Sequence, residues 1–396
     1  MRKTVGYERK STALDSPNQG HWLFPLLCCS PLFAVRARML LTPPHLYDFI
    51  TYWSAGRLFL TGGHPYSMTA MLATERSQGW AYTQPLMTFC PPWGLPILAV
   101  MSLPPFRAAQ IGWFAISLIL NCFSALGLWN YFGGEKRIAW IAVLVCATFI
   151  PMGGAEQLGQ ITPLILASLT AFLLLLRSER YFFAGVILLG FGAKPHLLYL
   201  VLLAILFWVV KKRAWTTLAG AAASYGTATI AALVYNPNSQ DYLRHTFGAA
   251  VEVTCSVGGA LRSIFGVQQL WLQFLPCFFG IAWFLSYWVK HRRQWDWQAH
   301  LPLLLIVSIA SSPYFWFHDF ILILPALIAV AVRGGYRSVD TLVAYLVVQG
   351  IVVAAFGLSM AWMCVASLLW IAFYFIAKSA TPSPKIPVPE VASVLP

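Results

Sequence analysis

Asp48 stands among aromatic residues in a chain that is otherwise mostly apolar. Tyr47 precedes it, and Tyr52 and Trp53 follow about one helical turn later. An ionised carboxylate beside hydrocarbon is costly, so it needs a partner or a chemical purpose. A carboxylate can act as a general base, and aromatic faces can stack on sugars or prenyl chains. The alternative is that Asp48 only caps the helix that follows, and the two roles are compatible.

A second group of candidate residues lies near the other end of the chain. The run 311–319 is rich in aromatic residues and ends on His318 and Asp319. Such a run can be no more than an interfacial aromatic belt. Alternatively, His318 can donate to a phosphate leaving group, and Tyr314 can stack on a sugar. Asp319 can contact the sugar, orient a neighbour or cap the next helix, so we predict site roles for all three.

Further polar residues stand beside apolar segments. Gln160 lies in a loop whose amides and hydroxyls suit sugar recognition and ordinary loop hydrogen bonding equally well. Pro195 removes a backbone donor and disfavours helix at Lys194, so we expect the backbone to open there and Lys194 to line a polar cavity. Arg262 directly precedes an apolar run and can bind phosphate, although a loop charge is more often only solvated.

The elements that position these residues are predicted to be membrane helices. The chain is 59% hydrophobic and 10% charged, with a mean hydropathy of +0.69, whereas about a quarter of a soluble chain is charged. An all-α polytopic bundle of about ten to twelve spans follows, with short loops and amphipathic helices, since one span takes about 20 residues. The main apolar runs are 109–131, 140–150, 162–176, 214–235, 265–289, 314–332, 342–358 and 361–377.

Basic clusters predict the orientation, because Lys and Arg are held back on the cytoplasmic side. They separate the apolar runs at Lys136/Arg137, Arg177/Arg180, Lys211/Lys212/Arg213, Lys290/Arg292/Arg293, Arg333/Arg337 and Lys378. The loops around Asp48, Gln160, Arg262 and His318 then share the opposite face. The net charge of +13 is spread over many loops and forms no single stripe, which argues against nucleic-acid binding.

The chain is expected to hold one membrane domain, residues 22–378. It contains a first extracytoplasmic loop, 46–92, and another, 236–262. Residues 1–21 and 379–396 are expected to be cytoplasmic tails, the second disordered. The first apolar run is short and interrupted by prolines, so Arg36 and Arg38 behind it must snorkel or pair.

No cofactor or metal is expected. The eight cysteines have no metal-ligand spacing, and most lie inside apolar runs as packing residues. Nucleotide-binding and zinc-protease motifs are missing, which argues against nucleotide-driven transport and zinc proteolysis.

An ordered set of motifs resembles glycosyltransferase family 87. The set comprises Tyr47-Asp48-Phe49 with Tyr52-Trp53 and Gly56, then Pro65-Tyr66, Pro91-Pro92, Gly159-Gln160 with Pro163, Ala184-Gly185, Lys194-Pro195, and Ser312-Pro313-Tyr314 with Asp319. Together they cover roughly residues 46 to 332. Each motif alone is weak, but the order makes the resemblance fairly specific.

The resemblance implies a GT-C enzyme of the inner (plasma) membrane with its site on the extracytoplasmic side. It would transfer a hexose, mannose in the best-known cases, from a polyprenyl-phosphate donor to a lipid or glycan acceptor with inversion. By motif, Asp48 would be the catalytic base, and Lys194, Arg262 and His318 would bind the donor phosphate. The sugar and acceptor contacts would be Tyr47, Tyr52, Trp53, Tyr66, Gln160, Tyr314 and Asp319. A transporter or lipid flippase is the alternative, but it should carry polar residues at the bilayer midplane and repeat-related halves.

Overall fold

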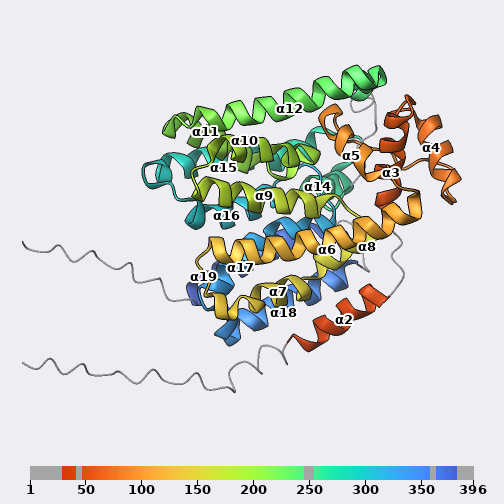
Figure 1. The fold of residues 1–396 in the computed structure, drawn as a ribbon. Coiled ribbons are helices and arrows are strands. Elements are labelled where there is room, and N and C mark those ends of the chain that lie inside the picture. The colour runs from red at the N-terminus through yellow and green to blue at the C-terminus, as the bar shows by residue number, and fades with distance from the viewer. Residues whose placement is uncertain (1–28, 42–46, 245–253, 357–362, 381–396) are drawn as a thin grey trace, which may run out of the picture.

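The computed structural model describes residues 29–41, 47–244, 254–356 and 363–380, and all regular elements in these ranges are helices (Figure 1). The expected N-terminal tail, residues 1–21, lies outside them, as do residues 381–396. The α-helices are α2 (Ser30–Leu41), α3 (Tyr47–Leu60), α4 (Met68–Ser77), α5 (Leu95–Met101), α6 (Phe106–Tyr131), α7 (Trp140–Thr148), α8 (Ile150–Leu158), α9 (Thr162–Arg177), α10 (Tyr181–Ile187), α11 (Tyr199–Lys212), α12 (Trp215–Tyr235), α14 (Val257–Phe265), α15 (Trp271–His291), α16 (Trp297–Ala310), α17 (Leu324–Val332), α18 (Val339–Phe356) and α19 (Met363–Ala380). Short 3-10 helices include η2 (Pro92–Gly94), η4 (Leu188–Ala193), η5 (Pro195–Leu197), η6 (Pro237–Asp241), η7 (Arg292–Gln294) and η8 (Phe317–Ile323).

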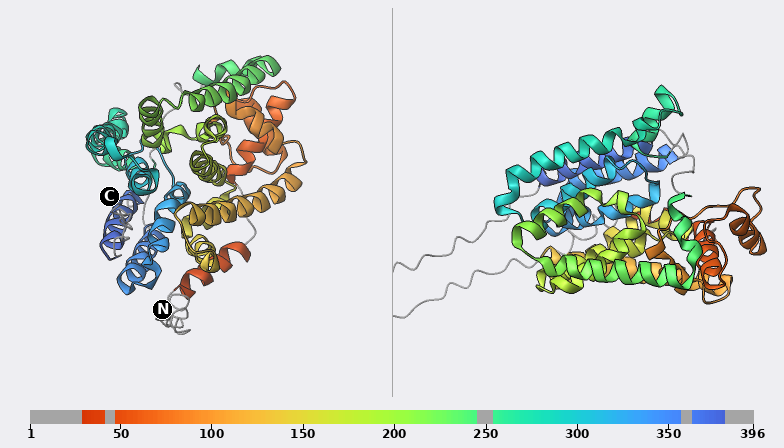
Figure 2. Two further views of the ribbon diagram at one scale, coloured as in Figure 1. Left: turned by 60° about the vertical axis from the view of Figure 1, so that its left-hand side comes forward. Right: turned by 90° about the horizontal axis from the view of Figure 1, so that it is seen from above.

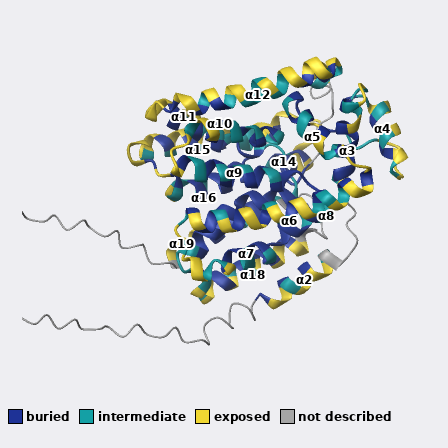
Figure 3. Ribbon diagram, viewed as in Figure 1, coloured by how far each residue is buried: buried dark blue, intermediate teal, exposed yellow. Residues whose placement is uncertain are grey.

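The chain is an all-α polytopic membrane protein. Among the described residues, α6, α12 and the segment Trp271–Gln294 are long and apolar enough to cross a membrane, and a bent pair, Lys136–Thr148 with Ile150–Leu158, makes a fourth candidate. Shorter apolar helices lie beside them. The innermost helices are buried, whereas α6 and α12 expose apolar side chains on the outside, as expected of lipid-facing surfaces (Figure 3). The figure of about ten to twelve spans stays a prediction.

The helices run back and forth between two ends of the bundle (Figure 1). At one end the basic loops meet: Arg177 donates to Asn130 O at 2.9 Å, and Gln298 donates to Tyr131 O at 2.6 Å. The opposite end carries α3, α4 and α5, and α4 stands out beyond the long helices (Figure 2). The loops with the basic clusters and the helix that begins at Tyr47 thus lie at opposite ends of the bundle, and their assignment to the two sides of the membrane stays a prediction.

A sharp bend between α7 and α8 is explained by Pro151. The two helices meet at an angle of 63°, because proline has no N–H to continue the helical hydrogen bonds and its ring clashes with the carbonyl four residues earlier. That carbonyl, Ala147 O, instead accepts a hydrogen bond from Arg36 Nε at 3.1 Å. Arg36 also pairs with Glu156 on α8, with 2.8 Å between Nη2 and Oε2. Arg36 is thus paired inside the protein, one of the two outcomes expected from the sequence.

The contact of α3 with α5 depends on Gly56. A Cβ at this position would lie 2.1 Å from Leu98 O, a backbone atom that cannot move aside alone. The helix that begins with Asp48 is therefore held directly against α5.

We expect Gly56→Ala to lower the thermal stability of the protein, because the added methyl group forces α3 away from α5. Thermal unfolding followed by intrinsic fluorescence measures the change. Gly112→Ala on α6 is the matched control, since a Cβ there meets nothing within 4 Å and alanine favours helix. Equal midpoints for both variants would contradict this packing.

Candidate active site

Asp48 lies in the first turn of α3, where a negative charge is stabilised by the helix dipole. Its Oδ2 accepts a hydrogen bond from Gln160 Nε2. Burial raises the pKa of Asp48, and the Asp319 charge adds to this, while the Gln160 hydrogen bond and the Lys194 charge act in the opposite direction. A carboxylate whose pKa is raised is a stronger proton acceptor, as a general base requires.

Gln160 is positioned by the end of α8. Gly159 adopts φ 70° there, a left-handed conformation that turns the chain, and Trp113 Nε1 donates to Gly159 O at 3.0 Å. Gln160 Oε1 accepts from Tyr52 OH at 3.2 Å and from Lys194 Nζ at 2.9 Å. Because a carboxylate only accepts and an ammonium only donates, the Gln160 amide has one consistent orientation between Asp48 and Lys194.

Lys194 occupies the break that Pro195 was expected to cause. The α-helix gives way to 3-10 geometry in η4, and Lys194 leaves helical geometry with φ −142° and ψ 69°. The next α-helix, α11, begins only at Tyr199. Besides Gln160, Lys194 Nζ donates to Asp319 Oδ1 at 2.7 Å and to Thr162 Oγ1 at 3.4 Å. The opened backbone therefore directs a cation toward polar partners inside the bundle.

Asp319 is fully buried in η8. In addition to Lys194, it accepts from Thr162 Oγ1 at 2.9 Å and from the Trp316 backbone N–H at 2.9 Å. A buried carboxylate needs such donors. Asp48, Gln160, Lys194 and Asp319 thus form one continuous chain of hydrogen bonds, which we call the polar chain.

Two histidines flank the polar chain. His318 is 5% exposed, and its Nε2 lies 3.8 Å from Asp319 Oδ1, beyond hydrogen-bond distance. His196 packs edge-on against the Tyr314 ring, with 5.5 Å between ring centres. Among the described atoms, Nε2 of each histidine is buried without a hydrogen-bond partner. Such nitrogens can bind a ligand group that the protein itself does not supply.

Other predicted site residues lie outside the polar chain. Trp53 Nε1 donates to Pro104 O at 3.1 Å, and Tyr66 OH donates to Cys90 O at 2.8 Å. Arg262 is 3% exposed and donates to Val267 O at 2.9 Å and to Gln273 Oε1 at 3.0 Å. Tyr47 is 43% exposed and contacts the Trp80 ring. The contacts of Trp53, Tyr66 and Arg262 hold the surrounding elements together.

Thr162 is a member of this site that the sequence did not reveal. Its hydroxyl lies between Lys194 and Asp319, yet Thr162 begins a helix and precedes a proline, where threonine is common for local reasons. Within the described part of the chain, no group of three His, Cys, Asp or Glu residues is placed to hold a metal ion. The expectation that no metal or cofactor is needed stays a prediction.

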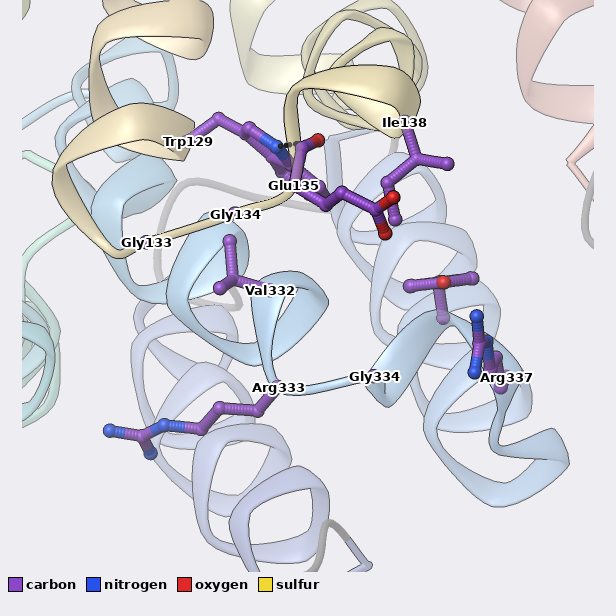
Figure 4. A pocket seen from close by; sticks show the side chains of 10 residues that line it. Trp129, Gly133, Gly134, Glu135, Ile138, Val332, Arg333, Gly334 and Arg337 are labelled. Carbon is purple, nitrogen blue, oxygen red and sulfur yellow. Dashed lines mark hydrogen bonds between the residues drawn. The ribbon is translucent and has the colours of Figure 1, made fainter. Parts of the chain in front are cut away.

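A cavity of about 340 Å³ lies at the other end of the bundle (Figure 4). It is lined by two glycine-containing turns, at Gly133 and at Gly334, and by charged side chains, among them Glu135 and Arg337. It belongs to the end with the basic loops and contains no member of the polar chain.

We expect Lys194→Met to destabilise the protein, because Asp319 would lose its charged partner while remaining buried. Breaking one side of a buried ion pair typically costs about 3–5 kcal/mol. Thermal unfolding of the purified protein measures it. The double variant Lys194→Met/Asp319→Asn, which removes both charges, should regain most of the loss. If the double variant is no more stable than Lys194→Met, the two residues do not form the pair described above.

Comparison with known protein families gives one match. The model of glycosyltransferase family 87 matches residues 89–319, more than half of the chain. The matched range contains Gln160, Lys194 and Asp319 but begins after the Asp48 motif. No curated protein and no solved structure matches the chain.

Proposed function

This chain belongs to glycosyltransferase family 87, and from that premise we propose that it transfers a hexose, mannose first, from a polyprenyl-phosphate donor to an acceptor hydroxyl. The observation that carries the proposal is the polar chain. It joins a carboxylate, an amide, a cation and a second carboxylate at one end of the bundle. A base and a cation held within one network suit the displacement of a phosphate by a hydroxyl.

In the proposed reaction, Asp48 takes the proton from the acceptor hydroxyl. The acceptor oxygen attacks the anomeric carbon, the bond from that carbon to the phosphate oxygen breaks, and polyprenyl phosphate leaves with the bonding electrons. One direct displacement inverts the configuration at the anomeric carbon. Gln160 holds the Asp48 carboxylate in place with its Nε2, because its Oε1 is itself fixed by hydrogen bonds from Tyr52 and Lys194.

Positive charge for the leaving phosphate comes from Lys194 in this proposal. Asp319 and Thr162 fix its ammonium group through hydrogen bonds, and 13% of the Lys194 side chain remains exposed. His318 adds a buried Nε2 that has no hydrogen-bond partner among the described atoms. Arg262 receives no phosphate role here, because its contacts to Val267 and Gln273 account for its guanidinium group.

The proposed side of the membrane is extracytoplasmic, in the inner (plasma) membrane. The argument is the segregation of charge: the basic loops lie at one end of the bundle and the polar chain at the other. A polyprenyl donor keeps its chain in lipid and brings its phosphate to the surface. A transporter gains no support, because the polar side chains gather at one end of the bundle.

Sugar transfer from defined donors tests the proposal. Membranes from cells that express the chain would be incubated with radiolabelled polyprenyl-phosphate mannose, polyprenyl-phosphate glucose, or the corresponding nucleotide sugars, with vector-only membranes as control. We expect label from a polyprenyl-phosphate sugar to enter a lipid or glycan product only when the chain is present. Direct use of a nucleotide sugar, or no product from any donor with folded protein, would overturn the proposal.

A further inference from the structure

Aromatic side chains cluster at the N-terminus of α3. Tyr47, directly before Asp48, is 43% exposed, and Tyr82 is 58% exposed. Trp80 is half-buried between them: its ring centre lies 6.0 Å from that of Tyr47 and 4.8 Å from that of Tyr82. We call these three residues the aromatic platform. Its rings present apolar faces next to the residue that we propose as the base.

The segment that carries Trp80 and Tyr82 is fixed in place. Its end is tied to α4 and α3, because Leu86 N donates to Glu75 Oε2 at 3.0 Å and Leu86 O accepts from Thr51 Oγ1. Trp80 Nε1 donates to Gln84 O at 2.8 Å within the segment. Rings held in this way lose little conformational freedom when a ligand binds, which favours binding.

The buried side chain of Glu75 also indicates that the segment with Trp80 and Tyr82 is fixed in place. Glu75 is 0% exposed, although it lies on a polar helix outside the apolar ones. Burial raises its pKa to about 7, and the hydrogen bond from the Leu86 backbone acts in the opposite direction. Burying this carboxyl group costs free energy, and its hydrogen bond to Leu86 N holds the segment in one conformation.

The surroundings of the aromatic platform are polar. Arg76, Ser77, Thr83 and Gln84 are exposed close to Trp80 and Tyr82 in the sequence. The exposed outer faces of α12 and α15, in contrast, are apolar. Exposed rings with hydroxyl and amide groups around them match a sugar ring, which offers C–H groups on its faces and hydroxyls at its edges.

We propose that the aromatic platform binds the acceptor of the reaction and that this acceptor is a saccharide, either a free glycan or the sugar head group of a glycolipid. Tyr47 and Asp48 are the first two residues of α3, so a saccharide stacked on these rings would lie at the helix end that carries the proposed base. The inference rests on the proposed function, because it specifies the acceptor of that reaction.

Direct saccharide binding tests the inference without relying on catalysis. The full chain would be placed in lipid nanodiscs, because maltoside detergents carry competing sugars. Linear mannotetraose and its octyl glycoside would be titrated by saturation-transfer NMR. The variants are Trp80→Ala, Tyr82→Ala and Tyr82→Phe, with Trp215→Ala as the matched control, since Trp215 is 53% exposed at the basic end of the bundle.

We expect Trp80→Ala and Tyr82→Ala to bind at least about ten-fold more weakly than the wild type, while Tyr82→Phe and Trp215→Ala bind normally. Binding of both probes would indicate a glycan acceptor, and binding of the octyl glycoside alone a glycolipid. Wild-type affinity in Trp80→Ala and Tyr82→Ala, or no binding of either probe to the wild type, would overturn the inference. If sugar transfer is nevertheless observed, the proposed function stands and only the assignment of the aromatic platform as acceptor site is withdrawn.

Discussion

Asp48→Asn is expected to slow sugar transfer by about a hundred- to ten-thousand-fold, the usual contribution of a general base. Asparagine has the same shape and still offers an oxygen to Gln160 Nε2, so the polar chain keeps its geometry. It cannot accept the acceptor proton at neutral pH. The measurement is the initial rate of label transfer at matched protein levels, and an unchanged rate would remove Asp48 from the mechanism.

Thermal unfolding of the same variant separates chemistry from stability. Because burial raises the pKa of Asp48 above its unfolded value, the folded state favours the protonated carboxyl. Its contribution to stability is therefore full at low pH and is lost as the pH rises through the folded pKa. Asparagine avoids the cost of the buried charge, so we expect the Asp48→Asn midpoint at neutral pH to equal or exceed that of the wild type.

The same raised pKa predicts the pH dependence of transfer. The base must be ionised, so kcat/KM should fall as the pH drops toward the folded pKa, at a higher pH than an unperturbed aspartate would give. A rate profile with vesicle-borne donor from about pH 3 to about pH 8, a range that includes the reference aspartate pKa of about 3.9, measures it. An acidic limb at the pKa of an ordinary aspartate would contradict the desolvated position of Asp48.

Arg36→Ala is the second substitution for which we expect a large effect, here on folding. Arg36 is 6% exposed and Glu156 is 2% exposed, so the variant leaves a buried carboxylate whose remaining partner is Asn121 Nδ2, at 2.8 Å. Ala147 O also loses its donor. We expect a loss of about 3–5 kcal/mol in the free energy of unfolding, measured by denaturant or thermal unfolding in nanodiscs.

Two controls make the Arg36 result specific. Arg38→Ala, on the exposed side of α2, should unfold close to the wild type. Arg36→Met/Glu156→Gln removes both charges and should recover part of the stability. Because Gln160 follows directly after the end of α8, Arg36→Ala should also impair transfer in the fraction that remains folded. A wild-type midpoint for Arg36→Ala would show that α2 does not depend on this pair.

Most helix positions followed from hydrophobicity. The runs 162–176 and 214–235 agree within a residue with α9 and α12. The run 265–289 does not: α15 begins only at Trp271, because Gly266 adopts φ 127° and ends α14. The hydrophobicity of the direct neighbours does not show this interruption, since Phe265 and Val267 on either side of Gly266 are both apolar. Gln160 was expected to lie in a loop, and it lies just beyond the end of α8, which continues to Leu158.

The members of the polar chain were each named from the sequence, but the hydrogen bonds between them were not predicted. Asp48, Tyr52, Gln160, Lys194 and Asp319 were each singled out as polar groups near apolar segments, and the fold brings them together. A single sequence does not indicate which acid pairs with which cation, because pairing over long separations depends on how the helices pack. Arg262 illustrates this limit. Its position before a span suggested phosphate binding, whereas the turn after α14 brings Val267 O to its guanidinium.

The ion pair between Lys194 and Asp319 also has a consequence for biosynthesis. The two residues are 125 positions apart, so at roughly 5–20 residues per second the ribosome needs about 6–25 seconds to deliver the aspartate after the lysine. During that interval Lys194 has no counter-charge from Asp319. An unpaired lysine is costly in lipid, so the opened backbone before Pro195 must stay near water until the last part of the site arrives. The pair can therefore form only once η8 has been synthesised, while α17, α18 and α19 are still to come.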